Sequence, residues 1–160
     1  QRVSQIEDLA QLVERWVHEF NGAYASQIEV GWVTAPQTVQ VEIDMSALRR
    51  VMRHLVHNAL RVMRYKGKLT LELTCLANEQ ILIQLTDTGP GIQNDDPIRQ
   101  RIFREPISEH GRKGLGLMFA RLFIEKLSGH LHLKDFAPDQ GATFCIYLPM
   151  KPPQNKKEKG

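Results

Sequence analysis

The sequence lacks any long hydrophobic run, and this absence excludes a membrane-spanning helix. No apolar stretch approaches the roughly 20 residues that a helix needs to cross a bilayer. The first ten residues, Gln1–Ala10, are polar and amphipathic and contain no signal-peptide core. We therefore expect a cytoplasmic location and no direct membrane contact. Because the chain opens within a helical pattern and without methionine, we interpret it as a fragment, whose parent protein could still be membrane-anchored.

Cysteine is scarce, and its placement argues against a metal or redox site. The two cysteines, Cys75 and Cys145, are far apart and show no C-x-x-C spacing. Both lie in segments where apolar residues alternate with polar ones. We therefore expect two buried thiols that serve only for packing.

The charge balance gives little support for a nucleic-acid partner. The formal net charge is +3, and much of the excess lies in residues 151–160, where lysines and prolines occur without apolar residues. Such a composition is typical of disorder. We therefore expect one domain over residues 1–150, a disordered tail over 151–160, and no nucleic-acid binding.

Hydrophobic periodicity predicts an α+β fold for this chain of 160 residues. Apolar residues at helical spacing predict amphipathic helices over 6–20, 44–65 and 115–127, the second of them capped by Asp44. Alternating residues predict strands over 28–32, 39–43, 69–75, 81–85, 130–134 and 142–148. This order indicates a two-layer α/β sandwich, in which three helices cover one face of a mixed, mostly antiparallel sheet.

Three polar residues share one face of the second predicted helix. His54, Asn58 and Arg61 stand at positions i, i+4 and i+7 among apolar neighbours. An Asn carbonyl oxygen is a hard ligand that suits Mg²⁺, and Arg61 could contact the phosphates of a substrate. The alternative is an ordinary solvated helix face.

An acidic, glycine-containing segment directly follows the apolar strand 81–85. It reads Asp87-Thr88-Gly89-Pro90-Gly91-Ile92. An acid at the end of a buried strand needs hydrogen-bond donors, and closely spaced glycines allow a ligand to approach the backbone. The exocyclic amine of adenine is a suitable donor. The alternative is a tight turn with a surface aspartate.

A second glycine-rich segment opens the third predicted helix. It runs over residues 111–117 as Gly-Arg-Lys-Gly-Leu-Gly-Leu. Backbone N–H groups at a helix N-terminus, together with basic side chains, form an anion site. The segment is neither a Walker A loop nor a Rossmann fingerprint. Taken alone, it could be a glycine-rich hinge.

Taken together and in this order, the segments resemble the histidine-kinase branch of the superfamily that also contains gyrase B, heat-shock chaperone and mismatch-repair ATPases. His54–Ala59 looks like the N box of this family, Asp87–Ile92 like its G1 box, and residues 114–117 like its G2 box. Arg101-Ile102-Phe103 looks like the F box, and Gly141-Ala142-Thr143-Phe144 like the closing strand pair. The resemblance covers the chain up to Pro149 and implies the Bergerat ATP-binding fold.

The resemblance also implies roles for individual residues. Asn58 would bind Mg²⁺, Asp87 would accept from adenine, and catalysis would involve His54, Asn58 and Arg61. Nucleotide contacts would come from the following residues: Asn58, Asp87, Gly89, Gly91, Ile92, Phe103, Lys113, Gly114, Leu115, Gly116, Leu117 and Thr143. The stretch from Arg99 to Lys113, part of the long irregular stretch 87–113, would form a mobile lid whose arginines await a polyanion.

Two departures from the family pattern bear on the activity. The ATP-hydrolysing branches place a glutamate where His54 stands, so His54 favours the kinase branch. The second phenylalanine of the F box is absent, with Pro106 and Ile107 in its place.

The sequence also lacks the H-E-x-x-x-P-like box of a phosphoacceptor histidine. His18-Glu19 is a superficial match without the proline. We therefore expect a monomeric catalytic fragment that uses ATP and Mg²⁺, with a helical-hairpin phosphoacceptor domain of the same kinase and a response regulator as partners. The alternatives are an ATPase of the gyrase or chaperone branch, and a degenerate module that binds nucleotide or a partner protein.

Overall fold

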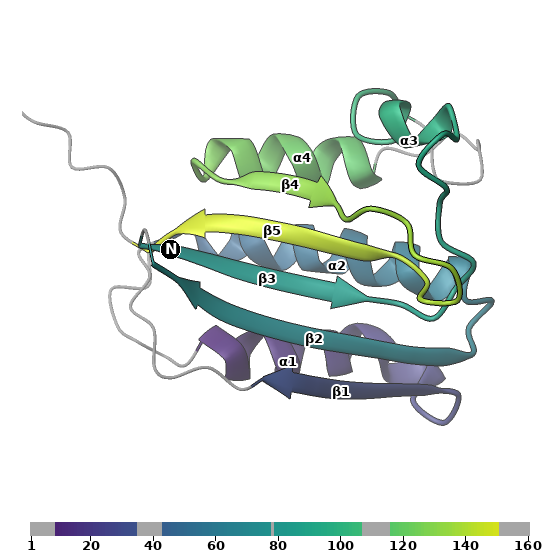
Figure 1. Cartoon of the computed structure of the whole chain (residues 1–160). Helices are drawn as coiled ribbons and strands as arrows, with labels where there is room; N and C mark the ends of the chain where they lie inside the picture. The colour runs from purple at the N-terminus through teal and green to yellow at the C-terminus, as the bar shows by residue number, and fades with distance from the viewer. Residues whose placement is uncertain (1–8, 35–42, 78, 107–115, 151–160) are drawn as a thin grey trace, which may run out of the picture.

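Five strands form one open, mixed sheet at the centre of the molecule (Figure 1). The computed structural model describes residues 9–34, 43–77, 79–106 and 116–150. The strands are β1 (Ile28–Thr34), β2 (Gly67–Leu76), β3 (Gln80–Thr86), β4 (His130–Leu133) and β5 (Thr143–Pro149). Their order in the sheet is β1-β2-β3-β5-β4. The β1–β2 pair is parallel and the other pairs are antiparallel, which confirms the predicted mixed, mostly antiparallel sheet.

Three amphipathic helices pack on one face of this sheet, as predicted (Figure 1). They are α1 (Leu9–Asn21), α2 (Met45–Val62) and α4 (Gly116–Lys126). Asp44 caps α2 as expected, because its side chain accepts a hydrogen bond of 3.2 Å from the Ala47 N–H. Two short elements complete the fold: the 3₁₀ turn η1 (Gly22–Tyr24) and the one-turn helix α3 (Ile98–Arg101). None of the described helices is long and apolar enough to cross a membrane.

The core lies between the helices and the inward side chains of the strands. On β3 the buried residues alternate with half-buried ones, as do those on β2 up to Leu73. The inward set of these two strands is Leu69, Leu71, Leu73, Ile81, Ile83 and Leu85. Because successive side chains of a strand point to opposite faces, the other set lies on the face without helices.

Three details differ from the sequence prediction. Helix α2 ends at Val62 instead of near residue 65, because Arg64 and Tyr65 adopt left-handed φ angles of 54° and 59°. The prediction that Cys75 is buried is wrong: it lies next to the end of β2, where the described residues leave it exposed, whereas Cys145 is buried. The predicted strand over 39–43, apart from Ile43, and the tail over 151–160 lie outside the described residues.

Candidate functional site

Asp87 follows the last residue of β3 and is almost completely buried, with 1% of its surface exposed. Its Oδ1 accepts hydrogen bonds from the Gly89 N–H at 2.8 Å and from the Ala142 N–H at 3.4 Å. Its Oδ2 is also buried but has no hydrogen-bond partner among the described residues. A buried carboxylate oxygen without a donor is costly. This oxygen is therefore an acceptor that a ligand can satisfy.

Burial dominates the electrostatics of Asp87. Removal from water raises the pKa of the carboxyl group, and the hydrogen bonds from the Gly89 and Ala142 backbone only partly counteract this. A donor from a ligand would stabilise the charged form and would lower the pKa again.

Two glycines allow the backbone to fold tightly around Asp87. Gly91 and Gly141 have φ angles of +71° and +68°, in the left-handed region that favours glycine. A Cβ atom at Gly141 would overlap the Asp87 carbonyl oxygen, and one at Gly91 would lie 2.6 Å from the Gly141 carbonyl oxygen and 3.0 Å from the Phe136 ring. Gly91 was expected at the site from its motif, whereas Gly141 was expected only as part of the closing strand pair, and no sequence pattern indicated Phe136. The residues Pro138-Asp139-Gln140-Gly141 are typical of a tight turn, and this pattern was the signal for a special backbone conformation at Gly141.

Thr88 connects the segment after β3 to α2 and β2. Its Oγ1 accepts a hydrogen bond of 3.1 Å from the Lys68 N–H and lies 3.4 Å from the Met63 sulfur. These contacts hold the segment between the end of α2 and the start of β2. No sequence pattern had indicated this role of Thr88.

On α2, the three polar residues differ strongly in exposure. Asn58 is buried, with 2% of its surface exposed, His54 is half-buried and Arg61 is exposed. A Cβ atom added to Gly116 would lie 3.3 Å from the His54 Nδ1. His54 therefore lies against Gly116, the first residue of α4. Helix α2 and the start of α4 meet at this histidine.

The environment of His54 favours the neutral form of its imidazole. Burial lowers the pKa of His54, and the nearby charges of His57, Arg53 and Arg50 lower it further. The pKa of His57 is also lowered, chiefly by burial and then by Arg53 and Arg61. A neutral imidazole can exchange hydrogen bonds without adding positive charge.

Of the second glycine-rich segment, residues 111–117, only Gly116 and Leu117 lie among the described residues. Gly116 is the first residue of α4, and Leu117 is buried beneath it with 3% of its surface exposed. Lys113, Gly114 and Leu115 lie outside the described residues.

Two residues with predicted nucleotide contacts, Thr143 and Phe103, have side-chain contacts with Thr86 and Phe144. The Thr143 hydroxyl lies 2.9 Å from the Thr86 hydroxyl, and both belong to the strand positions that face away from the helices. Phe103 packs edge-on against Phe144, with 6.0 Å between the ring centroids. The nucleotide contacts of Thr143 and Phe103 stay predictions.

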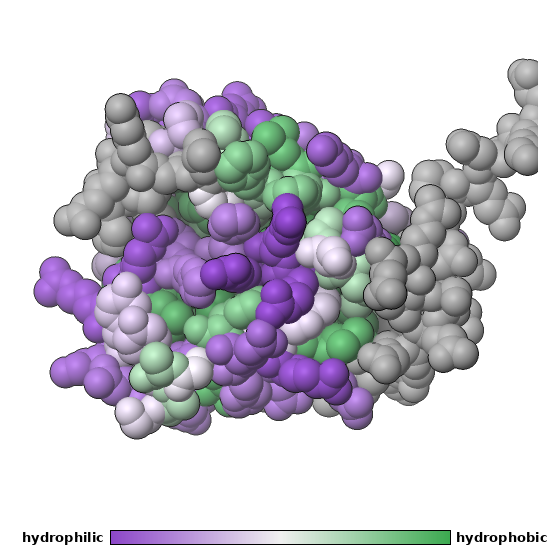
Figure 2. All heavy atoms as spheres, turned by 180° about the vertical axis from the view of Figure 1, so that it is seen from behind, coloured by the Kyte–Doolittle hydropathy of each residue, from purple (hydrophilic) through white to green (hydrophobic). Residues whose placement is uncertain are grey.

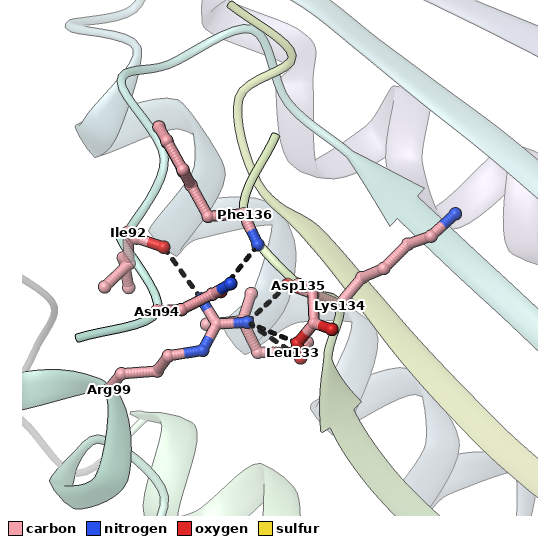
Figure 3. A network of polar contacts seen from close by, with 7 residues as sticks. All are labelled: Ile92, Asn94, Arg99, Leu133, Lys134, Asp135 and Phe136. Atoms are coloured by element: carbon pink, nitrogen blue, oxygen red, sulfur yellow. Dashed lines mark hydrogen bonds and ion pairs between the residues drawn. The ribbon is translucent and has the colours of Figure 1, made fainter. Parts of the chain in front are cut away.

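Arg99 forms the centre of a polar network between α3 and the end of β4 (Figure 3). Its guanidinium donates to the Ile92 carbonyl at 2.7 Å and to the carbonyls of Leu133 and Lys134. Only 13% of the Arg99 side chain is exposed, and Asp135 lies 3.9 Å away. Nearby, the Phe136 N–H donates to the Asn94 side chain at 2.8 Å.

This network corrects one expectation about the predicted lid. Arg99 does not await a polyanion, because backbone carbonyls already occupy its donors, and Arg101 pairs with Glu105 at 2.8 Å. The first part of the predicted lid is therefore anchored to the sheet. Residues 107–113 of the predicted lid lie outside the described residues.

Comparisons with known proteins agree with this geometry. Residues 43–152 match the family described as histidine kinase-, DNA gyrase B-, and HSP90-like ATPase. Among curated proteins, the sensor protein EvgS of Escherichia coli (strain K12) is 30% identical over 155 residues, which are 90% of this chain and 13% of EvgS. The swarming motility regulation sensor protein RssA of Serratia marcescens is 30% identical over 115 residues, which are 71% of this chain and 24% of RssA. The chain thus spans less than a quarter of the length of these relatives.

Solved structures show the same fold. The full-length ShkA structure, in complex with AMPPNP, has a TM-score of 0.78 at 23% identity, and the match covers 93% of this chain and 31% of ShkA. The catalytic domain of histidine kinase ThkA has a TM-score of 0.76 at 22% identity, with 91% of this chain and 96% of that chain covered. The chain therefore belongs to the histidine kinase-, DNA gyrase B- and HSP90-like ATPase family, as an ATP-binding domain of the sensor histidine kinase type.

Proposed function

We propose that this domain binds Mg·ATP and presents the γ-phosphoryl group to a histidine on a separate helical-hairpin domain of the same kinase. The observation that carries this proposal is the buried Asp87 Oδ2, an acceptor without a protein donor at the end of β3. The exocyclic amine of adenine supplies a donor of the right kind. Gly91 and Gly141 let the backbone pack closely around the same carboxylate.

Asn58 is the residue that would hold Mg²⁺. Its amide oxygen is a hard donor, and Mg²⁺ requires few protein ligands when substrate phosphates and waters complete its coordination. When bound, the ion neutralises phosphate charge during phosphoryl transfer. His54 stands four residues before Asn58 on α2, and the exposed Arg61 stands three residues after it, on the same helix face. In this proposal both lie near the phosphates and the acceptor histidine.

Replacing Asn58 tests the magnesium assignment. The Asn58→Ala variant should lose most of the Mg²⁺ dependence of nucleotide affinity, because it removes the protein ligand. Calorimetric titration with a non-hydrolysable ATP analogue, with and without Mg²⁺, measures this dependence. A variant with the parent's full Mg²⁺ dependence would contradict the role of Asn58.

The exposed side of α4 offers a surface for the hairpin domain. Phe119 and Leu122 of α4 are among the most exposed large apolar side chains of the described residues, at 37% and 38%. The ring of Phe119 lies 6.4 Å from that of Phe123, and the cationic groups of Arg50 and Lys126 each lie 5.9 Å from the Phe123 ring centroid. Figure 2 shows apolar surface over this part of the helical face. Because α4 begins beside His54, a hairpin docked there would place its histidine near the transferred phosphoryl group.

Phosphoryl transfer is best tested with the acceptor supplied separately. The domain alone should bind γ-labelled ATP without becoming labelled, and addition of a hairpin domain that carries the acceptor histidine should produce acid-labile label on the hairpin. Transfer should be slow, because an untethered hairpin has a lower effective concentration. The His18→Gln variant is the control. Label on the domain alone that disappears in this variant would make His18 the acceptor and would refute the proposed division of roles.

The rate of steady ATP hydrolysis distinguishes the kinase proposal from the alternative of a gyrase-type ATPase. Release of inorganic phosphate without a hairpin domain should remain near background, because position 54 holds a histidine instead of a carboxylate base. Rapid release would favour the ATPase alternative.

A further inference from the structure

The free edge of β4 borders a groove that none of the roles described above uses. β4 is the last strand of the sheet order, so one of its two edges lacks a neighbouring strand (Figure 1). A cavity of about 540 Å³ runs along this edge, between β4, α3 and α4. All four residues of β4 line it, together with Arg104 beyond α3 and Arg121 of α4. Asp87 and Asn58 do not line it.

The register of the sheet shows which backbone groups face this groove. The Lys134 N–H donates to the Thr143 carbonyl, so residues 134 and 143 form a hydrogen-bonded pair. In an antiparallel ladder such pairs alternate with non-hydrogen-bonded ones. The backbone groups of Leu131 and Leu133 therefore point outward, away from β5. Arg99 occupies the Leu133 carbonyl, whereas the N–H and C=O of Leu131 have no hydrogen-bond partner among the described residues.

The side chains of the groove favour an anionic occupant. Three arginines line it, Arg99, Arg104 and Arg121, against a single carboxylate, Glu125, which pairs with Arg121 at 2.9 Å. Arg104 is exposed and has no side-chain partner among the described residues. The formal charge of the lining side chains is therefore 3 − 1 = +2 with both lining histidines neutral.

We propose that the β4 edge binds an extended, acidic peptide segment of another protein as an additional strand. Main-chain hydrogen bonds to Leu131 would supply affinity, and acidic side chains would pair with Arg104. The volume of the groove suits a short segment, and Arg99 limits the pairing at one end by occupying the Leu133 carbonyl. This proposal does not depend on the phosphoryl-transfer function.

The test uses a fluorescein-labelled pentapeptide, Val-Glu-Val-Asp-Val, and fluorescence anisotropy with the whole chain. We expect saturable binding that persists when a non-hydrolysable ATP analogue occupies the nucleotide site. Arg104→Glu should weaken binding by about tenfold or more, because it reverses the charge opposite the acids. The matched control is Arg15→Glu, which makes the same charge change on an exposed residue of α1, at the other end of the sheet.

Two further measurements distinguish strand addition from simple charge attraction. A peptide of the same sequence, N-methylated at alternate residues, should bind at least about tenfold more weakly, because it cannot complete the ladder. Amide hydrogen exchange across 130–133 should slow in the presence of the unmodified peptide only.

Three results would overturn the proposal. The first is equal binding of both peptides, and the second is equal binding to the Arg104→Glu and Arg15→Glu variants. The third is a concentration-dependent dimer that Arg104→Glu abolishes, which would assign the edge to a second copy of this chain.

Discussion

Burial gives the Asp87 carboxylate opposite effects on binding and on stability. One oxygen is fully paired and the other has no partner among the described residues, so the empty site holds an incompletely solvated charge at neutral pH. Nucleotide binding would supply the missing donor. The stability of the empty domain and its affinity for nucleotide should therefore change in opposite directions when this residue is altered.

Replacing Asp87 by asparagine tests both effects. The Asp87→Asn variant should bind an ATP analogue about ten- to hundredfold more weakly, since a charge-assisted hydrogen bond contributes about 1.5–3 kcal/mol. Its free energy of unfolding at pH 7 should rise by about 1 kcal/mol, because a buried charge is removed. Calorimetry and urea unfolding measure the two quantities. Affinity equal to that of the parent chain would contradict the adenine assignment.

The raised pKa of Asp87 also predicts the direction of two pH dependences. The folded carboxyl group keeps its proton to higher pH than the unfolded one, so its contribution to stability is greatest below the unfolded pKa and is lost as pH rises through the folded pKa. Nucleotide affinity should change in the opposite sense and weaken as pH falls through the same range. Titrations of the parent chain and of Asp87→Asn between pH 4 and 7 should differ in slope. Equal slopes would show that another group controls binding.

At the scale of elements, Arg99 joins three segments that are distant in the sequence. It fixes α3 to the Ile92 carbonyl on one side and to the end of β4 on the other (Figure 3). The described start of the predicted lid is therefore held in place before any nucleotide arrives.

The Arg99→Met variant should lower the free energy of unfolding by about 1–3 kcal/mol, because it leaves backbone carbonyls without their donor. Hydrogen exchange over 98–102 should accelerate in the empty domain. The matched control is Arg104→Met, at an exposed arginine without a side-chain partner among the described residues, which should change neither quantity. Similar effects of both substitutions would remove the anchoring role of Arg99.

Local signals explain which elements the sequence could predict. The helices and strands follow from periodicity, and Asp44 and the segment after β3 follow from residue types at fixed spacing. The Arg99 network could not be predicted, because all of its acceptors are backbone carbonyls, which every residue type carries, and two of them are 34 and 35 residues away. Whether the Thr143 side chain faces the helices or the opposite face of the sheet depends on the register of β5. A shift of one residue would reverse the face.

At the scale of the whole molecule, we expect the domain to be a monomer in solution. The most exposed large apolar side chains of the described residues are only partly exposed, at 36–38%. A stable dimer interface buries a large area, usually with an apolar centre. Sedimentation equilibrium should give a mass near 18.3 kDa across micromolar concentrations. A mass that doubles over this range would contradict the prediction and would point to one of the two exposed surfaces described above.

The position of β5 between β3 and β4 also determines when the domain can fold during synthesis. Thr86 and Thr143 are neighbours in the sheet but stand 57 residues apart in the chain. Until β5 has been translated, β3 is an open edge, β4 has no strand to pair with, and Asp87 lacks the Ala142 N–H. The nascent chain therefore exposes an apolar strand while more than fifty residues are added. Translation products that stop before β5 should aggregate or require chaperones, and they should not bind nucleotide.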